Sequence, residues 1–342
     1  MNHLTSWADL PDDAWHTCLQ RARHHRQSRE WTDAAAQKTL ALLFLNPSLR
    51  TRASMELAAQ HLGAASVTLT PGSDSWGLAW DDAPMTGTAA EHVREAIPVL
   101  GSYADAIGIR TFAGLTDYDA DYTDAALGAV VEASSVPVVN LESARWHPCQ
   151  ELADAAALTE TFGDPRGKKL VLSWAPHPKP LPHAVGNSAL LMAARLGMEV
   201  VVARPEGFDL APDVMDLARD AARKAGGSVT ESGDQALAFE GAHAVYAKSW
   251  ADDLIYDDPV AEARRREAHA HWRVTYDLMR RTDRAHFMHC LPVRRGVVVD
   301  AEVLEDDRAI HLLQAEYRLH AQKAILEWVW GLGGSGVPGT GT

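Results

Sequence analysis

The sequence predicts an α/β protein built from two domains, each with a parallel sheet. Apolar runs of strand length alternate with amphipathic runs of helix length along most of the chain, which is the pattern of strand–helix–strand units. The length of 342 residues and the hydrophobic content of 46% are enough for two domains that each bury a core. Polar residues follow several of the apolar runs, at the strand ends where parallel sheets bind ligands.

The first half of the chain is expected to supply four strands of one sheet. The first of them, residues 40–45, is an apolar run that Asn46-Pro47-Ser48 ends. Further strands are expected at 65–69, 106–109 and 136–141, with helices at 51–62 and 91–103 and a loop at 71–87. Arg110 directly follows the third strand and is therefore expected at the edge of the sheet.

A second unit is expected to begin after residues 163–165 (GDP), because this turn sequence interrupts the helical pattern. Its strands are expected at 169–174, 199–203, 242–247, 272–275 and 287–291, and its helices at 188–196 and 211–225. A final helix at 315–330 precedes a glycine-rich tail from Gly331, which we expect to be frayed.

Composition excludes several classes of protein. A formal net charge of −14 argues against nucleic acid as a main partner. No apolar run approaches the ~20 residues that cross a bilayer, and the N-terminus lacks a secretory signal. We therefore expect a cytoplasmic protein with no membrane partner. The three cysteines are widely spaced and fit reduced thiols.

Neither a metal nor a cofactor is expected. The sequence contains 16 histidines, but it has no His-Glu-x-x-His motif and no paired-cysteine spacing. No Gly-x-Gly-x-x-Gly follows the first strand of either half. That absence argues against a dinucleotide-binding dehydrogenase.

The loop between the first strand and the first helix has the chemistry of a phosphate pocket. Ser48, Leu49, Arg50 and Thr51 open the helix, where backbone N–H groups and the helix dipole attract anions. Arg50 adds a guanidinium that can bind two phosphate oxygens. A serine at a helix start is commonly only a cap, so both interpretations stay open at this point.

Two further motifs follow along the chain. Residues 147–150 (HPCQ) stand directly before an amphipathic helix, with Pro148 at a favourable first helical position. Residues 289–292 (HCLP) end another apolar strand. Each motif alone is weak, because a His-Cys pair is more often part of the packing than of the chemistry.

In this order and at this separation, the three motifs resemble the transcarbamylase family, which transfers the carbamoyl group of carbamoyl phosphate to an amine. The resemblance spans nearly the whole chain. It implies that Arg110 bridges the phosphate and the carbonyl oxygen, and that His147 and Gln150 hold the carbonyl oxygen and the amide. Arg110 and His147 would then act together as an oxyanion clamp.

The resemblance also implies the remaining residues of the site. The catalytic residues would be Arg110, His147, Gln150 and Cys290. Carbamoyl phosphate would be bound by Ser48, Leu49, Arg50, Thr51, Trp76, Arg110, His147, Pro148, Cys149, Gln150, Cys290, Leu291 and Arg318. Trp76 lies in a loop that the family donates to a neighbouring subunit, which implies a homotrimer with shared sites. Without the resemblance, Arg318 would be a surface residue of the last helix.

Differences from the ornithine enzymes narrow the choice of amine substrate. Leu49 replaces the first threonine of their phosphate loop, and their Asp-x-x-x-Ser-Met-Gly segment is absent. Residues 246–250 (YAKSW) instead offer Lys248 as a cation for an α-carboxylate. These features resemble the N-acyl-ornithine transcarbamylases. The residues that would contact the acylated ornithine are Glu142, His177, Lys248, Leu291, Arg294 and Ala90.

Ala90 distinguishes the two acyl groups. The acetyl-specific branch resembles residues 88–92 but has a glutamate at the position of Ala90, whereas the succinyl branch has a non-acidic residue there. The acetyl branch also has a lysine at the position of Val298. We therefore expect N-succinyl-L-ornithine as the substrate, in arginine biosynthesis. N-acetyl-L-ornithine is the alternative, and a non-catalytic scaffold that binds carbamoyl phosphate is a more remote one.

The resemblance also implies domain boundaries and a topology. Residues 1–146 and 312–342 would form the carbamoyl-phosphate-binding domain, and residues 147–311 the acyl-ornithine-binding domain. The branch is known for a knotted backbone, which is rare in proteins. We expect the chain near residues 247–250 to pass through a loop of which residues 177–182 form part. In the reaction, the departing phosphate is expected to accept the final proton.

Overall fold

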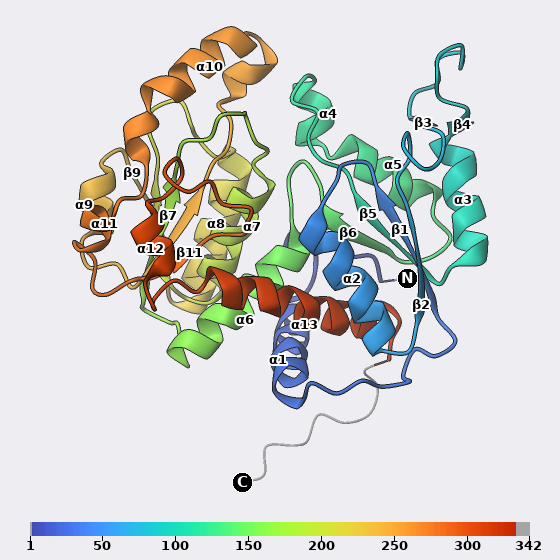
Figure 1. Cartoon of the computed structure of the whole chain (residues 1–342), viewed down its shortest axis with the longest axis horizontal. Coiled ribbons are helices and arrows are strands. Elements are labelled where there is room, and N and C mark those ends of the chain that lie inside the picture. The colour runs from blue at the N-terminus through green and yellow to red at the C-terminus, as the bar shows by residue number, and fades with distance from the viewer. Residues whose placement is uncertain (1, 333–342) are drawn as a thin grey trace. The chain divides into compact units, whose positions relative to one another are not determined.

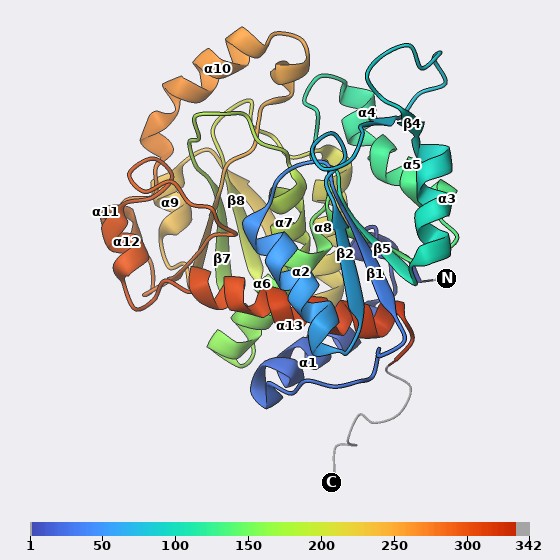
Figure 2. The ribbon, with the colours of Figure 1, turned by 45° about the vertical axis from the view of Figure 1, so that its right-hand side comes forward.

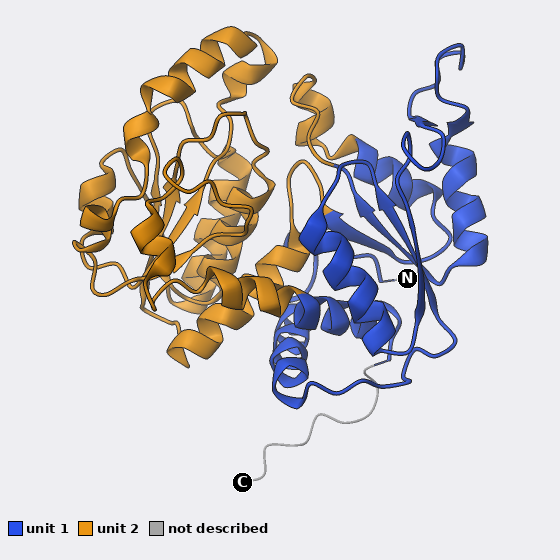
Figure 3. Ribbon diagram, viewed as in Figure 1, with its two compact units in different colours: residues 1–111, 126–141, 319–342 blue, residues 112–125, 142–318 orange. Residues whose placement is uncertain are grey.

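The computed structural model describes residues 2–332 as two compact units (Figure 1, Figure 3). The first unit comprises the chain up to residue 111, residues 126–141 and the chain from residue 319, and the second comprises residues 112–125 and 142–318. Each unit contains a parallel sheet, which confirms the predicted fold class. The predicted domain boundaries, near residues 146 and 311, separate two domains by the ligand that each would bind, and they stay a prediction.

The first unit carries the first four main strands. The elements that lie wholly or mostly in it are η1 (Trp7–Asp9), α1 (Asp12–Ser28), β1 (Thr39–Phe44), α2 (Leu49–His61), β2 (Ala65–Leu69), β3 (Leu78–Ala79), β4 (Glu91–His92), α3 (Val93–Tyr103), β5 (Ala106–Arg110), α5 (Ala125–Ala133) and β6 (Val138–Glu142). A long final helix, α13 (His311–Val329), begins in the second unit and ends in the first.

The sheet of the first unit has the strand order β2-β1-β5-β6. Apolar side chains of β1 and β5, such as Leu43 and Ile107, form one buried cluster with Ile97 of α3 and Val130 of α5. These two helices therefore cover one face of the sheet (Figure 1, Figure 2). Because β1 and β5 are parallel and Phe44 pairs with Arg110, both strands end at the same edge. The loop after β1 and the side chain of Arg110 thus share that edge.

The second unit carries the remaining elements. They are α4 (Tyr118–Tyr122), α6 (Pro148–Phe162), β7 (Lys169–Trp174), α7 (Ala184–Arg195), β8 (Glu199–Ala203), α8 (Pro212–Ala225), β9 (Ser228–Ser232), α9 (Gln235–Phe239), β10 (Ala244–Lys248), η2 (Asp253–Tyr256), α10 (Pro259–Ala268), η3 (Ala270–Trp272), α11 (Tyr276–Met279), β11 (His286–Met288) and α12 (Ala301–Glu305).

The sheet of the second unit has the order β11-β10-β7-β8-β9, and all of its pairings are parallel. Lys248, the last residue of β10, pairs with Trp174 and so lies at the carboxyl edge of this sheet. α6 is buried from Pro148 to Leu158, and α7 from Ala184 to Ala194. Both helices are rich in alanine, and such small side chains allow helices to pack closely.

Several strand predictions differ from the structure. The strand expected at 287–291 is β11 (His286–Met288), so Cys290 and Leu291 lie after it. Residues 272–275 do not form a strand: a 3-10 turn precedes a single bridge between Val274 and Val299. Buried Trp272 and Val274 flank polar Arg273 and imitate the alternation of a strand. The edge strand β9 was not predicted, because its sequence (SVTES) is largely polar and exposed. The expected loop at 71–87 also contains the two-residue strand β3.

The C-terminal tail that we expected to be frayed lies, from residue 333 onward, outside the described residues. Within residues 2–332, no helix combines the length and the apolar character that a membrane span requires.

Candidate active site

The predicted phosphate loop lies at the carboxyl edge of the first sheet. β1 ends at Phe44, and α2 begins at Leu49 with Ser48 as its N-cap. The hydroxyl of Ser48 accepts a hydrogen bond from the backbone N–H of Thr51 at 3.3 Å, so the capping interpretation is confirmed. The cap and an anion site are compatible, because a capped N-terminus keeps its positive dipole end. Phosphate binding at this loop stays a prediction.

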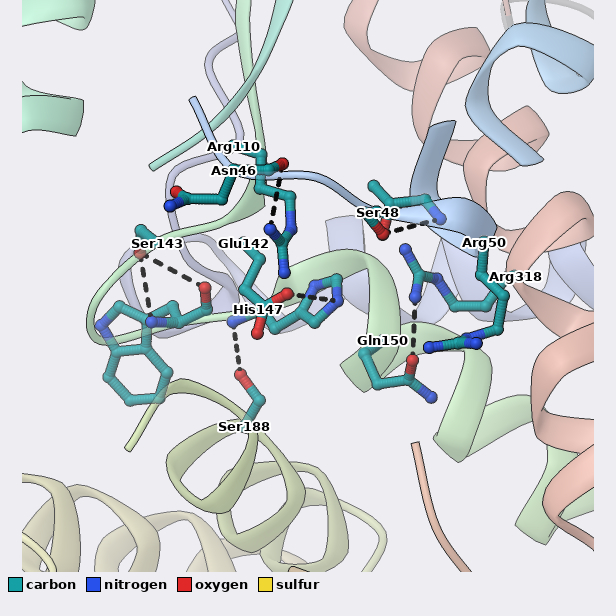
Figure 4. A network of polar contacts seen from close by, with 12 residues as sticks. Asn46, Ser48, Arg50, Arg110, Glu142, Ser143, His147, Gln150, Ser188 and Arg318 are labelled. Carbon is teal, nitrogen blue, oxygen red and sulfur yellow. Dashed lines mark hydrogen bonds and ion pairs between the residues drawn. The ribbon is translucent and has the colours of Figure 1, made fainter. Parts of the chain in front are cut away.

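The side chain of Arg110 forms hydrogen bonds with the backbone of the same loop. It is buried, with 8% exposed, and Nη1 donates to the carbonyl oxygens of Asn46 and Pro47 at 3.2 Å each (Figure 4). The parallel pairing of β5 with β1 positions the arginine there. Within the first unit, the structure therefore brings Arg110 together with the segment that leads into Ser48.

Trp76 and Ala90 occupy a second exposed region of the first unit. The indole of Trp76 is 62% exposed and donates to the carboxylate of Glu91 at 2.7 Å. Ala90 is exposed and directly precedes β4. Glu91, the acidic residue next to Ala90, therefore accepts a hydrogen bond from Trp76. The family resemblance assigns this tryptophan to the site of a neighbouring subunit. Sequence reasoning did not predict this contact.

His147 is the N-cap residue of α6 in the second unit, and Pro148 follows as the first helical residue. The backbone N–H of His147 donates to the hydroxyl of Ser188 on α7 at 2.9 Å. Its Nε2 lies 3.7 Å from a carboxylate oxygen of Glu142 at the end of β6 (Figure 4). The side chain of His147 is 4% exposed, so α7 and β6 fix its position inside the protein.

Gln150 and Arg318 form a buried pair. Arg318 Nη1 donates to Gln150 Oε1 at 2.9 Å (Figure 4), and the two side chains are 3% and 2% exposed. Burial lowers the pKa of Arg318, while the nearby Cys149, Glu142, Asp154 and Cys290 oppose that shift. A guanidinium remains protonated in proteins, so Arg318 is a buried cation beside the glutamine.

The segment with Cys290 and Leu291 follows β11. Leu291 has a φ of 57°, a left-handed conformation that is uncommon for a bulky residue and often marks functional sites. Its backbone N–H donates to His289 Nδ1 at 2.9 Å. The backbone N–H of His289 in turn donates to Gln314 on α13 at 2.9 Å. One hydrogen bond within the segment and one to α13 therefore maintain the conformation of this segment.

His177 and Arg294 are joined by a hydrogen bond of 3.0 Å from Arg294 Nε to His177 Nε2. His177 Nδ1 lies 2.8 Å from the carbonyl oxygen of Lys179 and 3.1 Å from its backbone nitrogen. Because the guanidinium can only donate, Nε2 accepts, so in the neutral ring Nδ1 carries the proton and donates to the carbonyl oxygen. Burial and the nearby cations of Lys248 and Arg294 lower the pKa of His177. At neutral pH, Arg294 rather than His177 therefore carries the positive charge of this pair.

Sequence reasoning missed two buried carboxylates on α6, Glu151 and Asp154, which are each 1% exposed. Their signal was present in the sequence: acidic residues in a helix whose other inner positions are mostly small and apolar. As for metals, the described residues contain no cluster of three or more His, Cys, Asp or Glu that could hold one.

The carboxylate of Glu151 leads to a prediction about stability. Neither of its oxygens has a hydrogen bond of good geometry, and Arg195 lies 4.0 Å away. Burial raises the pKa of Glu151 to about 8; Arg195 and the Ser188 hydroxyl oppose this shift, and Asp154 adds to it. Between pH 4.5 and 8 the folded state keeps a proton that the unfolded state releases, so the free energy of unfolding falls as pH rises.

Glu151→Gln should remove this fall in the free energy of unfolding with rising pH. In urea unfolding, we expect the variant to gain roughly 2–4 kcal/mol relative to the original protein between pH 5 and pH 8. Glu302→Gln, at an exposed position, is the control and should show no pH-dependent gain. Equal gains at both pH values would refute the explanation by a buried, protonated Glu151.

An α/β fold with cationic side chains at the carboxyl edges of its parallel sheets, Arg110 in the first unit and Lys248 in the second, is typical of enzymes that bind anionic ligands. Residues 2–160 match the carbamoyl-P binding domain of the aspartate/ornithine carbamoyltransferases, and residues 183–329 match their Asp/Orn binding domain. The chain belongs to the aspartate/ornithine carbamoyltransferase family, in its N-acyl-ornithine transcarbamylase branch, and is a carbamoyltransferase.

Two relatives and one solved structure illustrate the similarity. The chain is 43% identical to the N-acetylornithine carbamoyltransferase of Xanthomonas campestris pv. campestris, over 84% of this chain and 86% of the relative. It is 36% identical to the N-succinylornithine carbamoyltransferase of Bacteroides thetaiotaomicron, over 87% and 89%. A crystal structure of N-acetyl-L-ornithine transcarbamylase, with one glutamate replaced by alanine and complexed with carbamyl phosphate and N-succinyl-L-norvaline, has a TM-score of 0.92 at 40% identity, over 95% and 99%.

Proposed function

We propose that the protein transfers the carbamoyl group of carbamoyl phosphate to the Nδ amine of N-succinyl-L-ornithine. The products are N-succinyl-L-citrulline and phosphate, and the reaction would serve arginine biosynthesis. Family membership supports the carbamoyl transfer. The single observation that carries the choice of the succinyl group is that Ala90 presents no carboxylate.

The phosphate group would bind at the N-terminus of α2, through Ser48, Arg50, Thr51 and the backbone of Leu49. The helix dipole and the guanidinium both favour a dianion there. Trp76, Pro148, Cys149, Cys290 and Leu291 are the further residues that we assign to carbamoyl phosphate by family resemblance. Arg318 would add its buried positive charge.

The carbonyl oxygen of carbamoyl phosphate would be held by Arg110 and His147. Negative charge develops on this oxygen as the amine attacks, so fixed donors stabilise the transition state more than the ground state. Gln150 would hold the carbamoyl amide, and Cys290 belongs to the same predicted catalytic set. Positioning and this clamp would supply most of the acceleration.

The Nδ amine must lose its proton before it attacks. A free lysine-like amine has a pKa near ~10.4, so an environment that favours the neutral form is required. The departing phosphate is our proposed final proton acceptor. Glu142, which ends β6 next to His147, would contact the acylornithine, and Lys248 and Leu291 would bind other parts of it.

The succinyl group adds a carboxylate that needs a positive partner. Arg294 can supply one, because only its Nε is used by His177, and the guanidinium is exposed. His177 would hold the arginine and contact the acyl group. Val298 supports the same choice: it is 2% exposed, whereas the acetyl branch has a lysine at this position. In the solved relative, the replacement of one glutamate by alanine accompanies bound N-succinyl-L-norvaline.

N-acetyl-L-ornithine is the alternative substrate, and overall similarity favours it. The chain is 43% identical to an N-acetylornithine enzyme but 36% identical to an N-succinylornithine enzyme. Substrate choice depends on a few side chains, however, and not on overall identity. A non-catalytic protein that only binds carbamoyl phosphate would not need both Arg110 and the pair His147 and Gln150.

The proposed function is tested by phosphate release from carbamoyl phosphate with ornithine, N-acetyl-L-ornithine and N-succinyl-L-ornithine. We expect the highest kcat/KM with the succinyl substrate and little activity with free ornithine. Faster turnover of N-acetyl-L-ornithine at equal subsaturating concentrations would select the alternative. Binding of carbamoyl phosphate without turnover of any amine would indicate the scaffold.

The proposed assembly is a homotrimer in which each Trp76 completes the site of a neighbouring subunit. The exposed indole of Trp76 supports this assembly, because a large exposed aromatic side chain often marks an interface. Native mass spectrometry would measure the number of subunits, and a monomer that retains full activity would contradict the shared site.

The predicted backbone knot in the second unit is likewise a proposal. Ala251 N, one residue after the expected crossing segment 247–250, donates to the carbonyl of Leu181 at 2.9 Å, which supports a close approach of this part of the chain to the loop at 177–182. Tracing the chain in a crystal structure would test it, and a backbone that unties when both ends are pulled would contradict it.

A further inference from the structure

We infer that Asp154 is a positioning residue for the proposed carbamoyl transfer, because it fixes the side-chain amide of Gln150 in the orientation that carbamoyl phosphate needs. Asp154 itself does not touch the substrate. The inference rests on the function proposed above and adds a residue that none of the three sequence motifs contains.

Three donors from three elements converge on the carboxylate of Asp154. Asp154 lies one helical turn after Gln150 on α6, and both side chains are buried. Gln150 Nε2 and Gln314 Nε2 of α13 each donate to Asp154 Oδ1 at 2.7 Å. The hydroxyl of Tyr246 on β10 donates to Oδ2 at 2.8 Å. The carboxylate therefore holds α6, α13 and β10 in a fixed relation inside the second unit.

Both ends of the Gln150 amide are determined by these contacts. Its NH2 group faces Asp154, and its Oε1 accepts from Arg318 Nη1 at 2.9 Å. In a flipped amide, the NH2 group would face the guanidinium, which is donor to donor, and the oxygen would face the carboxylate, which is acceptor to acceptor. Neither pair could form a hydrogen bond. Asp154 and Arg318 thus select one orientation. In it, Oε1 has a second lone pair that can accept an N–H of the carbamoyl group.

The ionised carboxylate of Asp154 can accept all three hydrogen bonds. A neutral side chain can replace it only if it donates to the hydroxyl oxygen of Tyr246, because the two glutamine NH2 groups cannot accept. Burial raises the pKa of Asp154 to about 6, and the bonds from Gln314, Gln150 and Tyr246 and the charge of Arg318 oppose that rise. At pH 7 the carboxylate is therefore ionised. Arg318 balances its charge, with the amide of Gln150 as the bridge between the two ions.

Gln314 extends the network to the segment that contains Cys290 and Leu291. While its Nε2 donates to Asp154, its Oε1 accepts from the backbone N–H of His289 at 2.9 Å. One buried carboxylate thereby links Gln150 to the start of a segment that the family resemblance also assigns to carbamoyl phosphate.

The inference is tested by a double-mutant cycle in the full-length protein, measured by kinetics and by calorimetric binding of carbamoyl phosphate. Asp154→Ala should lower kcat/KM about 10- to 100-fold, chiefly by raising KM for carbamoyl phosphate, because the amide of Gln150 is released. Gln150→Ala should then cost little more in the Asp154→Ala background, since the amide is already misplaced.

Asp154→Asn is the rescue variant. Its Oδ1 can accept from both glutamines, and its NH2 group can donate to the hydroxyl oxygen of Tyr246. The orientation of Gln150 is then preserved, and we expect kcat/KM within about 5-fold of the original protein. If Asp154→Ala does not fold, Asp154→Ser leaves a smaller cavity and takes its place in the cycle.

Tyr317→Phe is the matched control for a structural effect. Tyr317 donates to Glu160, between the same two helices α13 and α6 but outside this network. The control should lower the melting temperature and leave KM unchanged. Losses from Asp154→Ala and Gln150→Ala that multiply in the double mutant would overturn the inference, as would a failed rescue by Asp154→Asn. A protein that binds carbamoyl phosphate without using any acylornithine would refute only the proposed function, because the cycle can still be measured by binding.

Discussion

Arg110→Ala is expected to lower kcat/KM by at least about 10²–10³-fold, the usual cost of losing one donor to a developing oxyanion. Arg110 is the last residue of β5 and lies beside the predicted phosphate loop. Its guanidinium is proposed to bridge the phosphate and carbonyl oxygens of carbamoyl phosphate. Its Nη1 also donates to the carbonyl oxygens of Asn46 and Pro47. Truncation therefore removes a ligand contact and loosens the loop that presents Ser48.

Arg21→Ala is the control for a general loss of stability in the first unit. Arg21 makes two bonds, of 2.8 and 2.7 Å, to the carboxylate of Glu327 in the same unit. Its loss should lower the melting temperature but leave turnover per folded molecule unchanged. Circular dichroism and phosphate release would measure both quantities for each variant. A folded Arg110→Ala protein with full activity would exclude the proposed mechanism.

The fold was predictable because hydrophobic burial in a parallel sheet produces continuous apolar runs. The strand at 65–69 and those at 169–174 and 199–203 have the predicted bounds. The pattern fails where a residue is buried without pairing in a strand, or where it pairs in a strand without being buried. Val274 is buried without a ladder, so it imitates a strand, and β9 pairs at an edge with a polar sequence and gives no signal.

For the candidate site, the sequence predicts residues only where a motif preserves their order along the chain. The structure brings Arg110 to the phosphate loop, Glu142 to His147, and Gln150 to Arg318. The partners of these groups come from distant segments and have no sequence signature. Gln314 donates to Asp154, which lies 160 residues earlier in the chain. Trp76 donates to Glu91, because the chain between them folds back. Such contacts depend on tertiary packing, which periodicity does not report.

Ala90→Glu is expected to shift the preference from N-succinyl-L-ornithine toward N-acetyl-L-ornithine. The succinyl carboxylate is ionised at pH 7, and a glutamate facing it at ~5 Å, with an effective dielectric constant near ~20, would repel it by roughly 3 kcal/mol. That energy corresponds to about two decades in the ratio of the two kcat/KM values. The acetyl substrate has no charge at this position, so its kcat/KM should change little.

Glu91→Gln is the control for a carboxylate one residue away. Its amide oxygen can still accept from the indole of Trp76, as the carboxylate of Glu91 does at 2.7 Å. Because that carboxylate is already directed at the tryptophan, its removal should change the succinyl-to-acetyl ratio by no more than about 3-fold. If Glu91→Gln raises the ratio as much as Ala90→Glu lowers it, the charge of Glu91 already acts on the acyl group, and the absence of a carboxylate at Ala90 no longer decides the substrate.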